Sequence, residues 1–135
     1  MLLSPARTAE AIVVGAIAMI ALASTGYYAG KTKEQEQRAA RMTRGDAENA
    51  SAILVQYGCA GCHSIPGIAA PGGLAGPQLS GLSKRLYIGG AVRHTPEGLI
   101  GFIVNPKQFS SQSAMPVTGI SEREARDVAA YLYTR

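Results

Sequence analysis

The most prominent pattern along the chain is an uninterrupted apolar stretch near its N-terminus. Residues 11–30 (AIVVGAIAMIALASTGYYAG) contain no charged side chain. An α-helix rises about 1.5 Å per residue, so a stretch of this length can cross a hydrocarbon layer of roughly 30 Å. Tyr27 and Tyr28 lie at its end, where aromatic side chains favour the membrane–water interface. The pattern predicts a transmembrane signal-anchor helix at 11–30, preceded by a short segment at 1–10.

The alternative interpretation of this stretch is a cleaved signal peptide. Arg7 would then form the basic region, and Ala21-Leu22-Ala23 would be the cleavage site. We expect the segment to be retained as an anchor. Its small residues, at Ala11-x-x-x-Gly15 and Gly26-x-x-x-Gly30, would allow a partner helix to pack closely, although small residues are also simply common in membrane helices.

After the apolar stretch the chain becomes polar and then helical again. Residues 31–45 (KTKEQEQRAARMTRG) carry charges of both signs and good helix formers. They predict a polar linker, which either continues the membrane helix or acts as a semi-rigid spacer. Asp46 is a plausible N-cap for a helix over 47–57, which Gly58 would end. Residues 65–81, rich in Pro and Gly, predict a long loop.

Two further helices are predicted in the C-terminal half. Thr95-Pro96 places an N-cap residue before a proline at the first helical position. Ser121-x-x-Glu124 is a capping box that precedes a last helix. Both helices have an apolar face, formed by Leu99, Ile100, Phe102 and Ile103 in the first and by Ala125, Val128, Ala129 and Leu132 in the second. No alternating strand pattern is visible, so residues 46–135 predict an all-α domain with much loop.

Composition narrows the class of protein. Hydrophobic residues make up 47% of the 135 residues and charged residues only 16%, which argues against long disorder. The net charge of +4 comes mainly from residues 1–45, which contain six basic and three acidic residues. A nucleic-acid-binding domain would carry its positive charge on the folded part, so we expect no nucleic-acid partner. Two cysteines exclude a disulfide-rich scaffold.

The motif that carries chemistry is Cys59-Ala60-Gly61-Cys62-His63, the C-x-x-C-H attachment sequence of c-type haem. Two thiols on one short turn can each form a thioether with a haem vinyl group, and the next residue, His63, then faces the iron as its proximal ligand. A thioredoxin-like redox pair would need a βαβ context, a zinc site would need a second ligand cluster, and a plain disulfide would not explain the histidine.

The sixth iron ligand can be sought among four methionines. Met1 is terminal, Met19 lies in the apolar stretch, and Met42 precedes the domain. Met115 lies in a loop before the last helix, where Pro116 would stiffen the backbone, and its soft thioether would favour ferrous iron. The alternatives are a Met115 that only fills a core gap, His94 as the ligand, or an open sixth position.

The size of the domain also favours a cofactor. Residues 46–135 contain no Trp and only two Phe, and a domain this small is marginal on its own core. Haem would supply a large apolar body, so we expect one covalently bound haem at the centre of the core.

These features together resemble a class I cytochrome c over residues 46–135. The resemblance rests on the Cys59–His63 motif, Gly76-Pro77, Met115-Pro116 and a C-terminal Ala129-Ala130-Tyr131-Leu132. It implies that the first and last helices cross near the haem edge, and that the carbonyl of Pro77 accepts a hydrogen bond from His63. The family often has Gly and an aromatic residue nine and five positions before the first Cys, where this chain has Ala50 and Leu54.

A narrower resemblance follows from five short stretches in order: Gly76–Leu79, Gly89-Gly90, Thr95–Leu99, Asn105–Lys107 and Met115-Pro116. This order resembles the cytochrome c domain fused to subunit II of bacterial haem–copper oxidases, without the copper-binding domain of that subunit. The anchored layout also resembles the small cytochrome subunit of bacterial nitric oxide reductase. Both resemblances imply a place at the donor end of a terminal reductase.

Three basic residues in the middle of the domain have more than one possible function. Lys84, Arg85 and Arg93 could pair with haem propionates or steer an acidic partner to the haem edge. The simpler interpretation is that they are solvated surface charges.

Two features make conflicting predictions about the side of the membrane on which the C-terminal domain lies. Five basic residues follow the apolar stretch closely and only Arg7 precedes it, which by charge bias would place the C-terminal part in the cytoplasm. Covalent haem attachment in the resembled family takes place outside the cytoplasm. We therefore expect a single-pass protein of the bacterial inner membrane, with its haem domain on the periplasmic side.

Three functional hypotheses remain open from the sequence. The first is an electron-transfer protein rather than an enzyme, which takes single electrons from a quinol-oxidising complex or a soluble cytochrome and passes them to a terminal oxidase, as a tethered carrier or as a subunit of the complex. The second is a haem sensor or peroxidase-like protein with an open sixth site. The third is a structural subunit in which haem only stabilises the fold.

Overall fold

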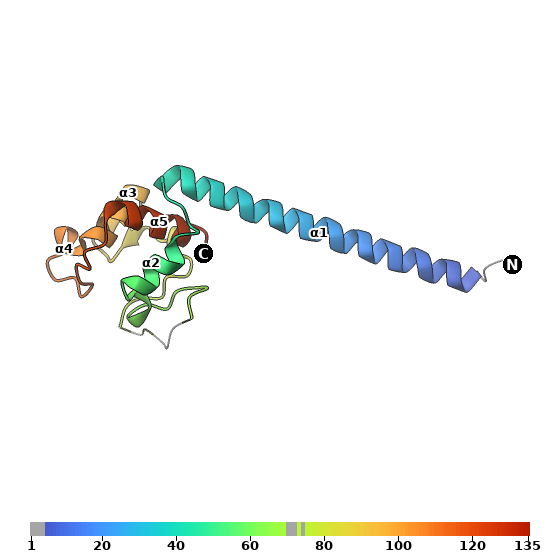
Figure 1. Ribbon diagram of the computed structural model, residues 1–135, viewed down its shortest axis with the longest axis horizontal. Coiled ribbons are helices and arrows are strands. Elements are labelled where there is room, and N and C mark those ends of the chain that lie inside the picture. The colour runs from blue at the N-terminus through green and yellow to red at the C-terminus, as the bar shows by residue number, and fades with distance from the viewer. Residues whose placement is uncertain (1–4, 70–72, 74) are drawn as a thin grey trace. The chain divides into compact units, whose positions relative to one another are not determined.

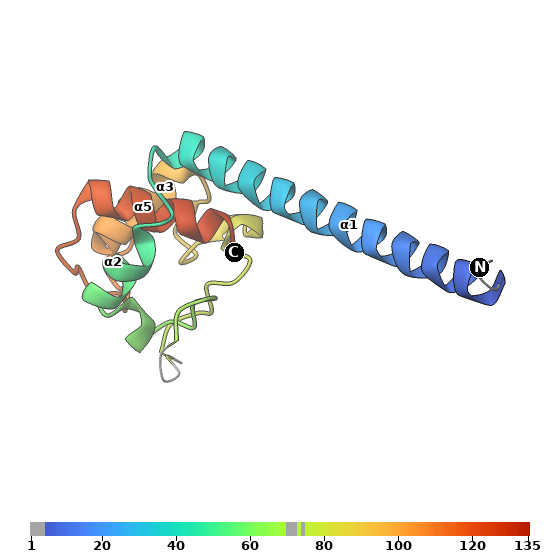
Figure 2. The same ribbon diagram turned by 45° about the vertical axis from the view of Figure 1, so that its right-hand side comes forward.

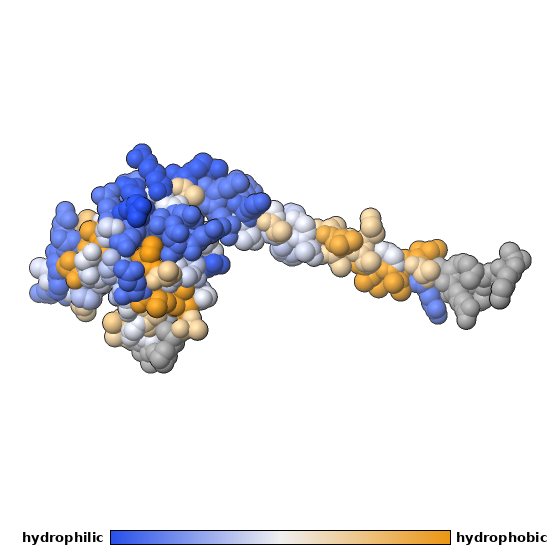
Figure 3. Space-filling model, viewed as in Figure 1, coloured by the Kyte–Doolittle hydropathy of each residue, from blue (hydrophilic) through white to orange (hydrophobic). Residues whose placement is uncertain are grey.

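The computed structural model describes residues 5–69, 73 and 75–135, and the chain divides into two compact units at residues 34 and 35. The first unit consists of most of a long helix, α1 (Pro5–Thr43). Side chains on all sides of its apolar stretch are exposed, among them Ile12, Val13 and Val14, and Figure 3 shows this hydrophobic stretch in orange. The segment is long and apolar enough to cross a membrane, by length and composition.

The same helix accounts for the predicted linker. Residues 31–43 continue α1 without a break, which is the first of the two alternatives expected for this segment. The second compact unit begins at Gln35, and Ala39 and Thr43 are both buried in it. The end of α1 therefore contributes to the fold of the C-terminal unit.

The C-terminal unit is mostly helical, as predicted. Its remaining elements are α2 (Ala50–Gln56), the 3₁₀ turns η1 (Cys59–Gly61) and η2 (Leu82–Lys84), β1 (Tyr87–Ile88), β2 (Val92–Arg93), α3 (Pro96–Val104), α4 (Pro106–Phe109) and α5 (Glu122–Tyr133). α5 packs against both α2 and α3, and the three helices lie together in Figures 1 and 2. Their facing side chains form the core of the unit.

The helix caps predicted in the C-terminal half are confirmed. The Thr95 hydroxyl accepts a hydrogen bond from the Gly98 amide at 3.0 Å. At the start of α5 both bonds of the capping box are present, from the Glu124 amide to the Ser121 hydroxyl and from the Ser121 amide to the Glu124 carboxylate. The apolar faces of both helices are buried as expected, at Leu99, Ile100, Phe102, Ile103, Ala125, Val128, Ala129 and Leu132.

The first helix of the domain starts later than predicted. Asp46 opens a turn, in which its carboxylate accepts a hydrogen bond from the Glu48 amide at 2.9 Å, and α2 begins at Ala50 with Asn49 as N-cap. Asp46 is instead bound to α5, because its amide donates to the Asp127 carboxylate at 2.7 Å. Ala50 and Leu54, the two positions that differ from the family pattern, are both fully buried against α5.

Two short strands add to the predicted all-α fold. β1 and β2 form an antiparallel hairpin in which Tyr87 lies opposite Arg93 and Ile88 opposite Val92. Gly89 and Gly90 form its turn, both with positive φ. Ile88 packs into the core, whereas Tyr87 and Arg93 are exposed on the outer face.

Candidate functional site

The two cysteines and the histidine of the motif lie on one compact turn. α2 ends at Gln56, and Gly58, with φ of +67°, turns the chain into η1. The carbonyl of Cys59 then accepts hydrogen bonds from the amides of Cys62 at 3.2 Å and His63 at 3.0 Å. These bonds place both thiols and the imidazole on a single turn of five residues, as the attachment of one group through two sulfurs and a neighbouring ligand requires.

Both thiols are free. Cys59 is half-buried and Cys62 is exposed. Burial is the main cause that raises the pKa of the Cys59 thiol, and the nearby Cys62 adds to it. A redox-active pair of the thioredoxin type depends on a thiol with a lowered pKa, so the environment of Cys59 argues against that interpretation.

The ring of His63 is held by a segment of the Gly- and Pro-rich loop. His63 Nδ1 lies 2.8 Å from the carbonyl oxygen of Pro77. A carbonyl can only accept a hydrogen bond, so in the neutral ring Nδ1 carries the proton and Nε2 keeps a free lone pair. The hydrogen bond that the class I resemblance implied is therefore present, and the ring is oriented for a ligand at Nε2.

Residues 76–79, which we name the strap, are bonded to the motif on both sides of His63. The Gly76 amide donates to the Cys62 carbonyl at 2.7 Å, and the Leu79 amide donates to the Ser64 carbonyl at 2.9 Å. A Cβ at Gly76 would lie 2.4 Å from Cε1 of His63, so only glycine allows the strap to approach the ring this closely. Four residues of the predicted 65–81 loop, 70–72 and 74, lie outside the described residues.

Met115 lies on a different segment, the loop between α4 and α5. Its side chain is half-buried against the hydrophobic core, and its amide donates to the Ser113 hydroxyl at 3.3 Å. Lys107 holds the same loop by donating to the carbonyls of Ser111 and Ser113. Among the hydrogen bonds of the described residues, none joins Met115 to the Cys59–His63 turn, so its ligand role stays a prediction.

His94, the alternative ligand, lies between β2 and α3. Its ring is tilted against that of Tyr133, with centroids 5.3 Å apart, and its Nε2 is buried without a hydrogen-bond partner among the described residues. Burial lowers the pKa of His94, and the positive charge of Arg85 lowers it further. His94 is thus a neutral ring packed on α5.

The three basic residues of uncertain role differ in their surroundings. Lys84 and Arg93 are exposed, on η2 and on the outer face of the hairpin. Arg85 is half-buried, and its guanidinium donates to the carbonyl of Gln78 in the strap. The simple surface-charge interpretation therefore fits Lys84 and Arg93 but not Arg85.

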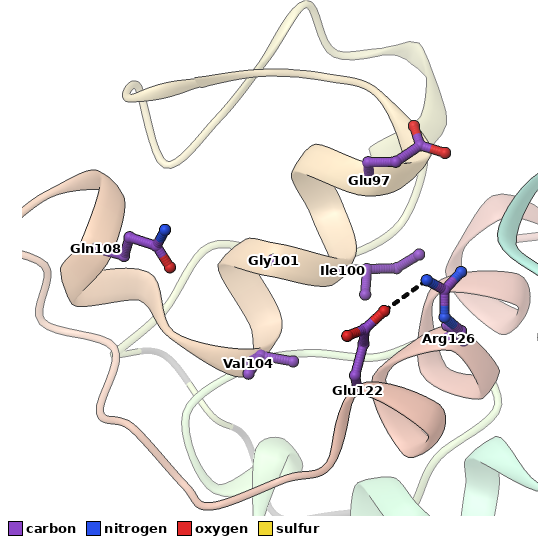
Figure 4. Close-up of a pocket in the computed structure, with 7 residues that line it drawn as sticks. All are labelled: Glu97, Ile100, Gly101, Val104, Gln108, Glu122 and Arg126. Carbon is purple, nitrogen blue, oxygen red and sulfur yellow. Dashed lines mark hydrogen bonds and ion pairs between the residues drawn. The ribbon is translucent and has the colours of Figure 1, made fainter.

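Described residues of the C-terminal unit line at least two hollows on its surface. One, of about 280 Å³, lies between α3, α4 and α5, with Ile100, Gly101 and Val104 on one side and the Glu122–Arg126 ion pair on the other (Figure 4). The second, of about 250 Å³, flanks the motif turn and has an apolar lining of Leu54, Val55, Gly58, Ala60, Gly61, Ile68 and Ala69. Within the described part of the chain, no group of three or more His, Cys, Asp or Glu side chains could hold a metal ion by itself.

The residues of this turn fit a haem. Two free thiols lie three residues apart on a tight turn, and the adjacent imidazole is oriented through Nδ1 and leaves Nε2 for iron. Cys59 and Met115 are both partly buried against the hydrophobic core. The arrangement supplies one strong metal ligand and two covalent attachment points.

Comparison with known proteins gives one family. Residues 47–135 match the family model described as Cytochrome c. No curated protein and no solved structure gives a significant match to the chain.

Proposed function

The chain belongs to the cytochrome c family, and on that premise we propose that it is a membrane-anchored monohaem c-type cytochrome that carries single electrons in a respiratory or photosynthetic chain. When bound, haem supplies an iron that alternates between the ferric and ferrous states. The observation that carries the proposal is the His63–Pro77 hydrogen bond beside two free thiols. We propose that the protein acts in electron transfer and has no enzymatic reaction of its own.

Each residue of the motif has one part in this proposal. Cys59 and Cys62 would hold the haem covalently, each through a thioether formed when its S–H adds across a vinyl group. His63 would ligate the iron through Nε2. Pro77 keeps the proton of His63 on Nδ1 and fixes the plane of the ring.

Met115 is proposed as the sixth ligand. It is half-buried, and Lys107 fixes the loop that carries it. Of the other methionines, Met19 is exposed in the apolar stretch and Met42 lies in the last turn of α1. A methionine thioether on iron raises the reduction potential, which suits a carrier.

An optical spectrum of the oxidised and reduced protein tests the ligation. We expect a weak far-red band from methionine on ferric iron in the wild type, its loss in Met115→Ala, and its retention in the matched control Met42→Ala. A wild type that lacks this band and binds carbon monoxide when reduced would instead have an open sixth site, and the sensor or peroxidase-like function would replace this proposal.

The membrane part of the proposal rests on α1. Residues 11–30 form the candidate anchor, and the haem domain follows it on the periplasmic side of a bacterial inner membrane. Deletion of residues 1–34 is expected to release the protein from membranes that retain the full chain after an alkaline wash. Release of the full chain by that wash would contradict the anchor.

The partner is proposed as a terminal oxidase, to which the protein is a donor or a bound subunit. The order of short stretches that resembles the cytochrome c domain of oxidase subunit II supports this choice. Reduced protein mixed with solubilised membranes should be reoxidised rapidly by oxygen and not by nitric oxide. Reoxidation that depends on nitric oxide would favour the reductase subunit, and the absence of rapid electron exchange would favour a purely structural haem.

A further inference from the structure

Arg85, which lies outside the motif, donates a hydrogen bond to the strap that orients His63. The Pro77 and Gln78 carbonyls belong to consecutive peptide groups of the strap. The first accepts from His63, and the second accepts from the guanidinium of Arg85. A rotation of the backbone at Gln78 that turned the Pro77 carbonyl away from His63 would also break the bond to Arg85.

Arg85 is itself fixed to the core. It follows η2 directly, and its amide donates to the Leu82 carbonyl at 3.0 Å. Leu82 is buried, η2 packs against α5, and the Gly81 amide donates to the carbonyl of Arg135 at 3.1 Å. The guanidinium thus extends from a rigid turn anchored on the last helix, unlike the exposed side chain of Lys84 beside it.

We propose that Arg85 is a positioning residue for the iron ligand, because it holds the Gln78 carbonyl and thereby keeps the Pro77 carbonyl on His63 Nδ1. This inference rests on the proposed ligation of haem iron by His63. The strength of the hydrogen bond at Nδ1 sets how much negative charge the imidazole carries, and that charge tunes a metal bound at Nε2. Pro77 has a fixed φ, so its carbonyl can turn only through ψ of Pro77 and φ of Gln78, and Arg85 restrains the peptide group that directly follows Gln78.

The test measures the Nδ1 proton of His63 by NMR in the reduced protein. In Arg85→Met the proton is expected to exchange with solvent at least about tenfold faster, the effect of losing one charge-assisted hydrogen bond, and to move upfield. Arg85→Lys, which can still donate one bond to the Gln78 carbonyl, is expected to lie between Arg85→Met and the wild type.

Two matched controls separate positioning from charge and from general stability. Arg93→Met removes a cation from the same part of the domain, but Arg93 is exposed on the hairpin and donates no hydrogen bond to the strap among the described contacts. Ser121→Ala removes the cap of α5 and leaves the strap intact. Both controls are expected to leave the shift and exchange rate of the His63 proton at the wild-type values.

Each result decides between the inference and its alternatives. If Arg85→Met moves the proton no more than Arg93→Met does, Arg85 acts only by charge or not at all, and the inference fails while His63 ligation stands. If Ser121→Ala speeds the exchange equally, the effect is one of stability and the inference also fails. If Arg85→Met does not retain haem, Arg85→Lys gives the same decision. If the wild type shows no His63 proton of a bound imidazole, the proposed function itself is wrong.

Discussion

The guanidinium of Arg126 on α5 donates a 3.0 Å hydrogen bond to the backbone carbonyl of Thr43, in the last turn of α1. The last carbonyls of a helix have no partner within the helix, and a cation at this end also complements the helix dipole. Thr43 is fully buried, and Arg126 is only 26% exposed and is oriented by a 2.5 Å ion pair with Glu122. α5 therefore caps the helix whose N-terminal part is the candidate anchor.

This contact gives the first prediction. Arg126→Gln is expected to lower the free energy of unfolding of the full chain in detergent by about 1–2 kcal/mol, because a buried carbonyl loses a charged donor. Arg123→Gln is the control, because Arg123 is exposed on the same helix, and its effect should stay within about 0.5 kcal/mol. Equal effects of the two substitutions in denaturant titrations would mean that the Thr43 contact adds nothing to stability.

A second prediction concerns Gly45, two residues beyond the end of α1. A Cβ at this position would lie 2.1 Å from the carbonyl oxygen of Arg126, which is backbone and cannot move aside alone. Gly45→Ala should therefore destabilise the chain by at least about 2 kcal/mol, the cost of overpacking at a tight contact. Gly30→Ala, where no heavy atom lies within 4 Å, should not destabilise it. Matching melting temperatures for the two variants would contradict the close approach.

The capping box gives a third prediction. Ser121→Ala should cost about 1 kcal/mol of stability, the usual effect of losing an N-cap side chain. Hydrogen bonds from Ser121 are the main cause that lowers the pKa of Glu124, so the variant should also return that pKa toward its ordinary value. Ser51→Ala, on the exposed side of α2, is the control. Carboxylate titration by NMR and denaturant unfolding measure the two effects separately, and an unchanged Glu124 pKa would exclude the box in solution.

The features that the sequence predicted correctly are those determined by near neighbours. The caps at Thr95 and Ser121 depend on residues three positions away, and the buried faces of α3 and α5 follow from periodicity alone. The hairpin at 87–93 was missed because strands of two residues show no alternation, although the Gly89-Gly90 pair is a turn signal that could have indicated it.

The features that were missed depend on contacts distant in sequence. Asp46 forms an ordinary N-cap pattern, but its amide binds Asp127, and α2 starts three residues after the predicted position. The role of Arg85 depends in the same way on a carbonyl in the strap, and its sequence neighbours do not distinguish it from Lys84. The motif turn itself was predictable, because Cys59, Cys62 and His63 are close in sequence, whereas the ligand role of Met115 depends on a loop 52 residues away and stays a prediction.

His94 leads to the last prediction, on pH dependence. Burial, followed by the charge of Arg85, lowers the pKa of His94 below its ordinary value of 6.5, and Tyr133 beside it stays neutral because burial raises the pKa of its hydroxyl. Below about pH 6.5 the unfolded chain therefore binds a proton that the folded chain does not, so stability should fall as pH falls from 6.5 toward the lowered folded pKa.

His94→Gln cannot titrate and should flatten this slope, whatever its absolute stability. The pKa of Glu124 is lowered in the folded state, so protonation of its carboxylate destabilises both proteins at more acidic pH. The two proteins are therefore compared between about pH 5 and pH 8. As pH falls across this range, the unfolding free energy of the wild type should drop relative to that of His94→Gln, and parallel curves would mean that His94 is solvated and titrates normally.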